Sequence, residues 1–144
     1  MARAYWLENS APEVWSWAQQ VEAGAKGTYW NGVRNPSAKL NLMAMKRGDR
    51  AFFYHSNEGK EVVGIVEVIR ESYPDPTAEP GEPWVVVDFA AVEPMPRPVS
   101  LAAVKAEPTL SKMSLVTSMR LSVQPVTAEE WAKVCAMGGL GSAA

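Results

Sequence analysis

Cysteine and histidine are scarce in this sequence of 144 residues, which contains only Cys135 and His55. A single cysteine excludes an internal disulfide, and a zinc site would have to be built mostly from carboxylates. A Ser-His-Asp triad that used Ser56 and His55 is unfavourable, because neighbouring residues of a strand point to opposite faces. Cys135 falls on the apolar stripe of a predicted helix, where it is expected to pack. We therefore predict no metal, no cofactor and no catalytic residue, which argues against an enzyme.

Other common signals are also missing from the chain. It has no glycine-rich phosphate loop followed by Lys-Ser/Thr, and no dinucleotide-binding fingerprint. No stretch approaches the roughly 20 apolar residues that span a bilayer, and charge precedes any apolar run at the start, which predicts no signal peptide. Internal repeats and low-complexity tracts are absent as well. We expect one cytoplasmic domain over residues 1–144, without membrane contact and with a frayed tail from about 139.

Tryptophan is abundant in the chain, and positive charge is concentrated in one segment. Six tryptophans are unusual at this length and favour aromatic packing or an aromatic-lined site. The net charge of −2 argues against broad binding to nucleic acid. Between positions 34 and 50, however, Asp49 is the one acid among five basic residues, namely Arg34, Lys39, Lys46, Arg47 and Arg50. This segment could attract phosphate, although a solvated helix face is the simpler explanation.

The hydrophobic pattern predicts an α+β fold in which long strands are joined mostly by non-helical segments. Alternating or continuous apolar runs predict strands over residues 4–7, 51–55, 61–70, 84–91 and 121–124. Prolines at 94, 96 and 98 are expected to end the fourth strand, and the proline-rich segment 73–83 is expected to form a loop over the barrel mouth. This pattern favours a mixed β-barrel of five to six strands with helices packed around its edges.

Capping signals predict where the helices begin. Ser10 with Glu13 forms one capping box, and Thr127 with Glu130 forms another before the last helix. A short helix is expected over residues 100–105. In the helix that follows Asn35, we expect three side chains to face the core, namely Leu40, Met43 and Ala44.

The segment over residues 29–35, Tyr-Trp-Asn-Gly-Val-Arg-Asn, is the strongest candidate for ligand binding. Pro36 keeps Asn35 out of the helical region, so that Asn35 can cap a helix beginning at Pro36. Trp30 offers a flat aromatic face, and the amides of Asn31 and Asn35 each offer a donor and an acceptor. This combination suits a flat ligand with a polar edge, such as a nucleobase.

Two further segments carry polar side chains near strand ends. Alternation places Phe53 and His55 on one face of their strand and Tyr54 and Ser56 on the other. For His55, a hydrogen bond within the core is favoured over a ligand-binding role.

Near residue 120, alternation places Ser118, Arg120 and Ser122 on one face. Arg120 could bind a phosphate or a base edge bidentately, and an ion pair with Asp88 or Glu67 is equally favoured.

The chain resembles the EVE domain family of the PUA-like superfamily over nearly its whole length. The resemblance is carried by seven segments: Tyr-Trp-Leu at 5–7, Trp-Asn-Gly-Val-Arg-Asn at 30–35, Gly-Asp-Arg-Ala-Phe-Phe-Tyr-His-Ser at 48–56, Gly-Ile-Val-Glu-Val at 64–68, Tyr-Pro-Asp-Pro-Thr at 73–77, Trp84 with Val87-Asp88, and Arg-Leu-Ser-Val-Gln-Pro-Val at 120–126. It implies a PUA-like barrel with a pocket similar to those of YTH and SRA domains. Where the family usually has Lys-Ser-Glu-Pro, this chain has Asn9-Ser10-Ala11-Pro12, so a cation and an acid are replaced.

The resemblance also implies which residues would form the pocket. Trp30 would stack on the base, and Tyr54 and Trp84 would form walls. Three side chains would hydrogen-bond the base edge, namely Asn35, Ser56 and Ser118. Four basic residues would meet backbone phosphate or form the outer rim, namely Arg34, Lys39, Lys46 and Arg120. The implied partner is DNA or RNA that carries a modified base. The alternatives are a nucleotide or other small molecule in the same pocket, or an interaction protein in which the same aromatic residues form a homodimer or partner interface.

Overall fold

The computed structural model describes residues 3–10, 15–29, 35–56, 59–118 and 121–140. Its centre is a sheet of six strands in the order β2-β5-β4-β3-β1-β6. The strands are β1 (Tyr5–Ser10), β2 (Thr28–Tyr29), β3 (Arg50–His55), β4 (Glu61–Pro74), β5 (Val85–Ser100) and β6 (Val123–Val126). β1 pairs with β3 in parallel and with β6 in antiparallel orientation, so the sheet is mixed.

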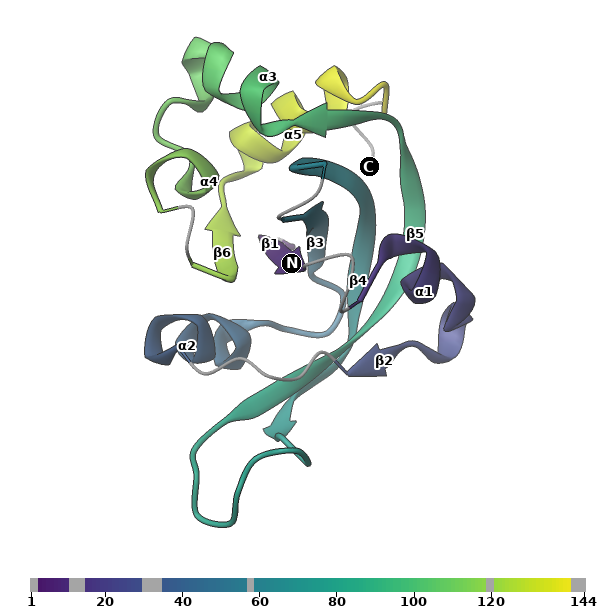
Figure 1. The fold of residues 1–144 in the computed structure, drawn as a ribbon, viewed down its shortest axis with the longest axis vertical. Helices are drawn as coiled ribbons and strands as arrows, with labels where there is room; N and C mark the ends of the chain where they lie inside the picture. Colours follow the sequence, from purple (N-terminus) through teal and green to yellow (C-terminus); the bar gives the residue numbers. More distant parts are fainter. Residues whose placement is uncertain (1–2, 11–14, 30–34, 57–58, 119–120, 141–144) are drawn as a thin grey trace.

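The sheet curls strongly around the middle of the molecule (Figure 1). This architecture confirms the α+β class and the mixed sheet with helices around it. In the described residues the sheet is open, because its edge strands β2 and β6 are not paired with each other. All five predicted strands are present, whereas the short β2 had no sequence signal.

Strand β5 continues through the prolines at 94, 96 and 98 to Ser100, so the prediction that these prolines end the strand was wrong. Between the pairs Gly64↔Pro94 and Val62↔Val99, β5 contains more residues than β4, which marks a bulge. A bulge interrupts the ladder, and proline is tolerated there because its missing N–H is not needed. The N–H of Arg97, between two of the prolines, donates instead to the carbonyl of Gly138 at 2.9 Å.

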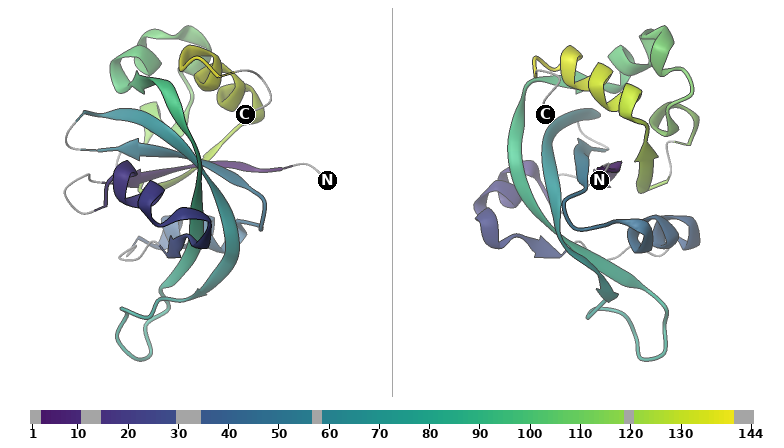
Figure 2. Two further views of the ribbon diagram at one scale, coloured as in Figure 1. Left: turned by 90° about the vertical axis from the view of Figure 1, so that its right-hand side faces the viewer. Right: turned by 180° about the vertical axis from the view of Figure 1, so that it is seen from behind.

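The connection between β4 and β5 is shorter than the predicted loop over 73–83, because β4 extends to Pro74. The N–H of Asp75 donates to the carbonyl of Trp84 at 2.9 Å, which closes this hairpin. Figures 1 and 2 show the hairpin projecting beyond the rest of the sheet. The expected loop over a barrel mouth is therefore a projecting hairpin.

The helices lie in two groups on the two sides of the sheet. The helices α3 (Leu101–Ala106), α4 (Ser114–Thr117) and α5 (Ala128–Met137) gather together, whereas α1 (Trp17–Glu22) and α2 (Pro36–Ala44) lie apart from them (Figures 1 and 2). Two short 3₁₀ helices, Gly24–Lys26 and Pro108–Leu110, complete the described elements.

Two of the predicted caps are confirmed. Asn35 caps α2, its side-chain oxygen accepting from the N–H of Ala38 at 3.0 Å, and Pro36 is the first helical residue. Thr127 and Glu130 form the predicted capping box of α5.

The capping box predicted at Ser10 was wrong. Ser10 ends β1, and its hydroxyl donates to the carbonyl of Trp15 at 2.7 Å. Helix α1 begins at Trp17 and is capped by Ser16 together with Gln19. Glu13 lies outside the described residues, as does the end of the predicted frayed tail, 141–144.

Alternation along the strands divides the buried side chains into two clusters, one on each face of the sheet. We call one the α5 face, which includes Leu7, Phe52, Tyr54, Ile65, Trp131, Val134 and Cys135. We call the other the α2 face, which includes Trp6, Ala38, Leu42, Phe53, Val68, Phe89 and Val123. Cys135 is buried on the α5 face as predicted, and burial raises the pKa of its thiol to about 11.

Helix α2 turns a different side toward the sheet from the one predicted. Ala38 and Leu42 are fully buried, whereas Leu40 and Met43 are 62% and 50% exposed. The helix carries apolar residues on both sides, so hydrophobicity alone did not determine its rotation. The side chain of Asn41 helps to fix the rotation, because its amide nitrogen donates to the carbonyl of Val123 at 2.7 Å.

Candidate ligand-binding face

Helix α2 borders the α2 face on the side of β6. The Asn41–Val123 hydrogen bond ties the helix to β6, and Ala38 packs one turn before Asn41. Asn35 lies at the exposed N-terminal end of this anchored helix. The sequence therefore places Asn35 at a fixed position beside the sheet, at the point where the 30–34 segment joins it.

Trp17 borders the same face on the side of β3. Its ring lies edge-on to Phe53, with the ring centroids 5.5 Å apart. A Cβ atom at Gly64 would lie 2.4 Å from the Trp17 ring, which explains why β4 has a glycine there. The backbone N–H of Trp17 donates to Nε2 of His55 at 3.0 Å. The α1 end is thus fitted closely against β3 and β4.

His55 forms an internal hydrogen bond as predicted, with Nε2 as the acceptor. Burial lowers its pKa below the usual value, and the nearby charge of Glu61 opposes that shift. The lowered pKa keeps the ring neutral near pH 7, which preserves the acceptor.

Glu8 lies on β1 between these two borders. It shares its side of the strand with Trp6 and Ser10, and its neighbours across the sheet are Phe53 on β3 and Val123 on β6. Its side chain is 1% exposed, and Oε2 has no hydrogen-bond partner within the described part of the chain. Burial raises the pKa of Glu8 to about 8, so the carboxyl group is mostly protonated at pH 7.

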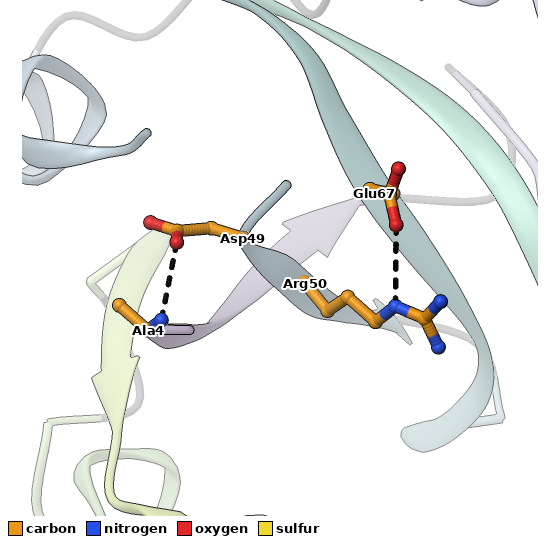
Figure 3. Close-up of polar contacts among 4 residues, drawn as sticks. All are labelled: Ala4, Asp49, Arg50 and Glu67. Atoms are coloured by element: carbon orange, nitrogen blue, oxygen red, sulfur yellow. Dashed lines mark hydrogen bonds and ion pairs between the residues drawn. The ribbon is translucent and has the colours of Figure 1, made fainter. Parts of the chain in front are cut away.

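The position of Glu8 is costly for the fold. Leaving a buried polar group without a partner destabilises a protein by about 1–3 kcal/mol. Two other buried polar residues are well bonded by comparison. Asp49 accepts from the N–H of Ala4, from Nε1 of Trp6 and from the N–H of Lys46 at 2.9–3.1 Å (Figure 3 shows the bond to Ala4).

Gln20 is the other well-bonded buried residue. It accepts from Nε1 of Trp15 at 2.9 Å and donates to the carbonyl of Phe89 at 3.0 Å. Both Asp49 and Gln20 connect segments that are distant in sequence, so each has an evident structural role. Glu8 has no such bond from Oε2 among the described residues.

Two of the predicted polar residues lie near the ends of the strands that flank Glu8. Ser56 directly follows β3 and is half-buried, and its N–H donates to the carbonyl of Ser10 at 3.0 Å. Ser118 is exposed at the end of α4, and its carbonyl accepts from Nε2 of Gln124 at 3.0 Å. Gln124 lies in β6, so Ser118 is tied to the strand that pairs with β1.

The two predicted wall residues lie in different parts of the fold. Tyr54 is 4% exposed and belongs to the α5 face, where burial raises the pKa of its hydroxyl. Trp84 is half-buried and directly precedes β5 at the base of the projecting hairpin. Trp30, Arg34 and Arg120 lie outside the described residues.

The basic residues of α2 and the following turn lie near the surface. Lys39 is half-buried and Lys46 is exposed. A hollow of about 330 Å³ is lined by Arg3, Ala4, Ala44, Lys46, Arg47, Gly48 and Asp49. Arg50 does not join this group, because its Nε lies 3.3 Å from Oε1 of Glu67 in an ion pair (Figure 3).

Sequence reasoning missed Glu8. The available signal was its spacing from Trp6, which places both side chains on one side of β1. Within the described residues there is no group of three or more His, Cys, Asp or Glu side chains that could hold a metal ion. In the same residues, no helix combines the length and the apolar character needed to cross a membrane.

Comparison with known proteins places this fold in a family. The family model for the EVE domain matches residues 4–137. A solved structure of a protein from Agrobacterium tumefaciens is 61% identical and superposes with a TM-score of 0.93, over 95% of this chain and 94% of that chain. Mouse thymocyte nuclear protein 1 is 35% identical over 88% of this chain and 70% of its own length. The chain belongs to the EVE domain family.

Two solved complexes are among the similar structures. Human THYN1 in complex with 5-methylcytosine-containing DNA is 33% identical, with a TM-score of 0.87 over 94% of this chain and 98% of that chain. The YTH domain of Zygosaccharomyces rouxii MRB1, solved with N6-methyladenosine RNA, shares the fold at 14% identity, with a TM-score of 0.58 over 96% of this chain and 88% of that chain. The latter likeness concerns the fold alone.

Proposed function

We propose that this protein is a non-enzymatic module that binds a modified base in DNA or RNA. The observation that carries the proposal is the likeness to human THYN1, whose structure contains 5-methylcytosine DNA and which this chain matches over 94% of its length. The likeness to the YTH domain supports the proposal only through the shared fold.

The α2 face is the side on which we place the base. The α5 face is filled by the α5 helix and a three-ring stack, in which Trp131 lies 3.9 Å from Phe52 and 4.5 Å from Tyr5 between ring centroids. The α2 face is instead bordered by a helix N-terminus and holds a carboxyl group whose Oε2 has no partner among the described residues. A polar-edged ligand could provide such a partner.

Within this proposal, Trp30 stacks on the base and Asn35, Ser56 and Ser118 hydrogen-bond its edge. The capping bond of Asn35 uses its side-chain oxygen, so the amide nitrogen is the atom offered to the ligand. Trp84 forms a wall, whereas Tyr54 supports β3 from the opposite face. Phosphate is met by basic residues, namely Arg34, Lys39, Lys46 and Arg120.

Binding of labelled oligonucleotides, followed by fluorescence anisotropy, tests the proposal. The probes are single-stranded and duplex DNA with one 5-methylcytosine, RNA with one N6-methyladenosine, and the same sequences without the methyl group. We expect at least one methylated probe to bind more tightly than its unmodified counterpart. Trp30→Ala should weaken that binding by about tenfold, because base–aromatic stacking contributes about 1–3 kcal/mol. Leu40→Ala, at an exposed position of α2, is the control and should leave binding unchanged.

Equal affinity for methylated and unmodified probes would overturn modified-base recognition. Binding of free nucleotide but of no oligonucleotide would instead favour a small-molecule pocket. If the protein binds no probe and its apparent molecular mass doubles as the protein concentration is raised, the dimer would be favoured.

A further inference from the structure

The carboxyl group of Glu8, whose Oε2 has no partner among the described residues, has a position that suits a ligand better than a structural role. Glu8 is one of two buried side chains in the described residues that have an oxygen without a partner. The other is Gln124, but its Nε2 donates to the carbonyls of Ser118 and Leu121 at 3.0 and 2.9 Å and so holds the turn before β6. Oε2 of Glu8 holds no described element in place.

Glu8 is buried on the α2 face, between two borders that hydrogen bonds hold in place. Phe53 and Trp17 lie on one side, in edge-on contact with each other. Val123 lies on the other side, where its carbonyl anchors Asn41 of α2. Both borders are fastened by hydrogen bonds of α1 and α2, so Glu8 lies at the base of the sheet surface between the two helices.

An uncharged carboxyl group offers one donor and one acceptor side by side. That arrangement complements an amino group next to an unprotonated ring nitrogen, as on the pairing edge of cytosine, 5-methylcytosine or adenine. The base amino group would donate to one carboxyl oxygen, and the O–H of the other oxygen would donate to the ring nitrogen. A carboxylate has no donor and would place its charge against that nitrogen.

We propose that Glu8 is a specificity-determining residue that hydrogen-bonds the amino and ring-nitrogen edge of the bound base. This inference rests on the function proposed above and adds the class of base edge that is read. The burial that leaves Glu8 without a partner also raises its pKa, so the protonated form that the pairing requires prevails at pH 7.

Other charged and titratable side chains lie on the described elements that pack around Glu8. They are Asp49 before β3, His55 on β3, Lys39 on α2 and Glu22 on α1, and β6 carries none. Arg50 and Tyr54 of β3 alternate with Phe53 and belong to the side of the α5 face. The pKa of His55 is lowered by burial, so its ring stays neutral above pH 7. Burial raises the pKa of Glu8 to about 8, so its carboxyl group is expected to lose its proton between pH 7 and pH 9.

Affinity for DNA with one 5-methylcytosine, measured against pH for wild type and for Glu8→Gln and Glu8→Met, tests the inference. Wild-type affinity should fall about tenfold from pH 7 to pH 9, because the protonated fraction of a group with a pKa of about 8 falls by that factor. Glu8→Gln keeps a donor and an acceptor and does not ionise, so its affinity should stay level across this range. Glu8→Met should bind about tenfold more weakly at pH 7, without pH dependence. Glu129→Gln, at an exposed acid of α5, is the control and should follow the wild-type curve.

A structural role for Glu8 would give a different result. If Glu8→Met binds like wild type, or if Glu8→Gln retains the wild-type pH dependence, the inference is overturned while the proposed function stands. Tighter binding at high pH would mean that a carboxylate faces two donors, which also overturns it. If wild type binds no methylated probe at any pH, the proposed function fails and this inference fails with it. Circular dichroism and thermal unfolding of each variant check that it is folded.

Discussion

The two faces of the sheet each carry a hydrophobic cluster but differ in the polar groups that they bury. On the α5 face, Trp131 is stacked against both Phe52 and Tyr5, and Cys135 packs as a small apolar residue. On the α2 face, β1 buries the carboxyl group of Glu8 beside Trp6 and Phe53. Core packing explains the first arrangement but not the second, because an apolar side chain at position 8 would be more stable.

This difference teaches how one strand can serve two purposes. Leu7 points to the α5 face and Glu8 to the α2 face, so adjacent residues of β1 belong to different environments. Substitutions on the α5 face should alter stability alone. Substitutions on the α2 face should alter binding, and in the case of Glu8 they should raise stability.

The largest expected effect is that of Trp131→Ala on the α5 face. Removing a buried ring that stacks on two others should lower the free energy of unfolding by about 3–5 kcal/mol. Urea denaturation measures this, with the exposed Leu40→Ala as the control within about 0.5 kcal/mol of wild type. Protein that remains folded should bind the methylated probe normally. A loss of affinity in that folded fraction would contradict the division between the faces.

Glu8→Gln should produce the next largest effect, and its size should depend on pH. Burial raises the pKa of native Glu8 to about 8 from the ordinary glutamate value of 4.5, so the native state holds its proton more tightly than the unfolded state. Its contribution to stability is therefore greatest at low pH and is lost as pH rises from about 4.5 to 8. The stability of the variant relative to wild type should rise by about 3 kcal/mol between pH 5 and pH 8. Urea denaturation at several pH values checks this, and a constant difference would mean that Glu8 ionises normally.

Gly64→Ala should disturb the α1 side of the α2 face. The added Cβ would lie 2.4 Å from the Trp17 ring, so the ring must move, at a cost of about 1–3 kcal/mol. Because Trp17 also packs on Phe53, we expect weaker binding of the methylated probe together with a lower melting temperature. Unchanged stability and unchanged binding would show that α1 is not held closely against β4.

Asn35→Ala should give the smallest loss of stability, about 1 kcal/mol, because it removes one capping bond to the N–H of Ala38. Thr127→Ala removes the corresponding cap of α5 and is the matched control. Both variants should lose a similar amount of stability in thermal unfolding, but Asn35→Ala alone should weaken binding of the methylated probe. Equal binding by the two variants would remove Asn35 from the proposed site.

Local signals in the sequence were sufficient for much of the fold. Pro36 fixed the start of α2 and Asn35 its cap, because both act through their own backbone neighbours. The rotation of α2 could not be predicted, since it depends on the bond from Asn41 to Val123, which is distant in sequence. The course of β5 through its prolines depends in the same way on a bulge against β4 and on the bond from Arg97 to Gly138.

The candidate site was only partly accessible to the same reasoning. The position of Asn35 followed from its capping role, which the structure confirms. The burial of Glu8 did not, because a glutamate on a short strand ordinarily faces water. It is buried on β1 between two neighbouring strands, β3 and β6, and the pairing of β1 with β6 joins segments distant in sequence.

The place of β1 between β3 and β6 has a consequence for biosynthesis. β6 is formed near the C-terminal end of the chain, by residues 123–126, yet it covers an edge of the first strand. While the chain is still emerging from the ribosome, β1 can pair with β3 but leaves its other edge open to strands of neighbouring chains. Premature termination before residue 123 should therefore yield an aggregation-prone product that quality-control proteases remove.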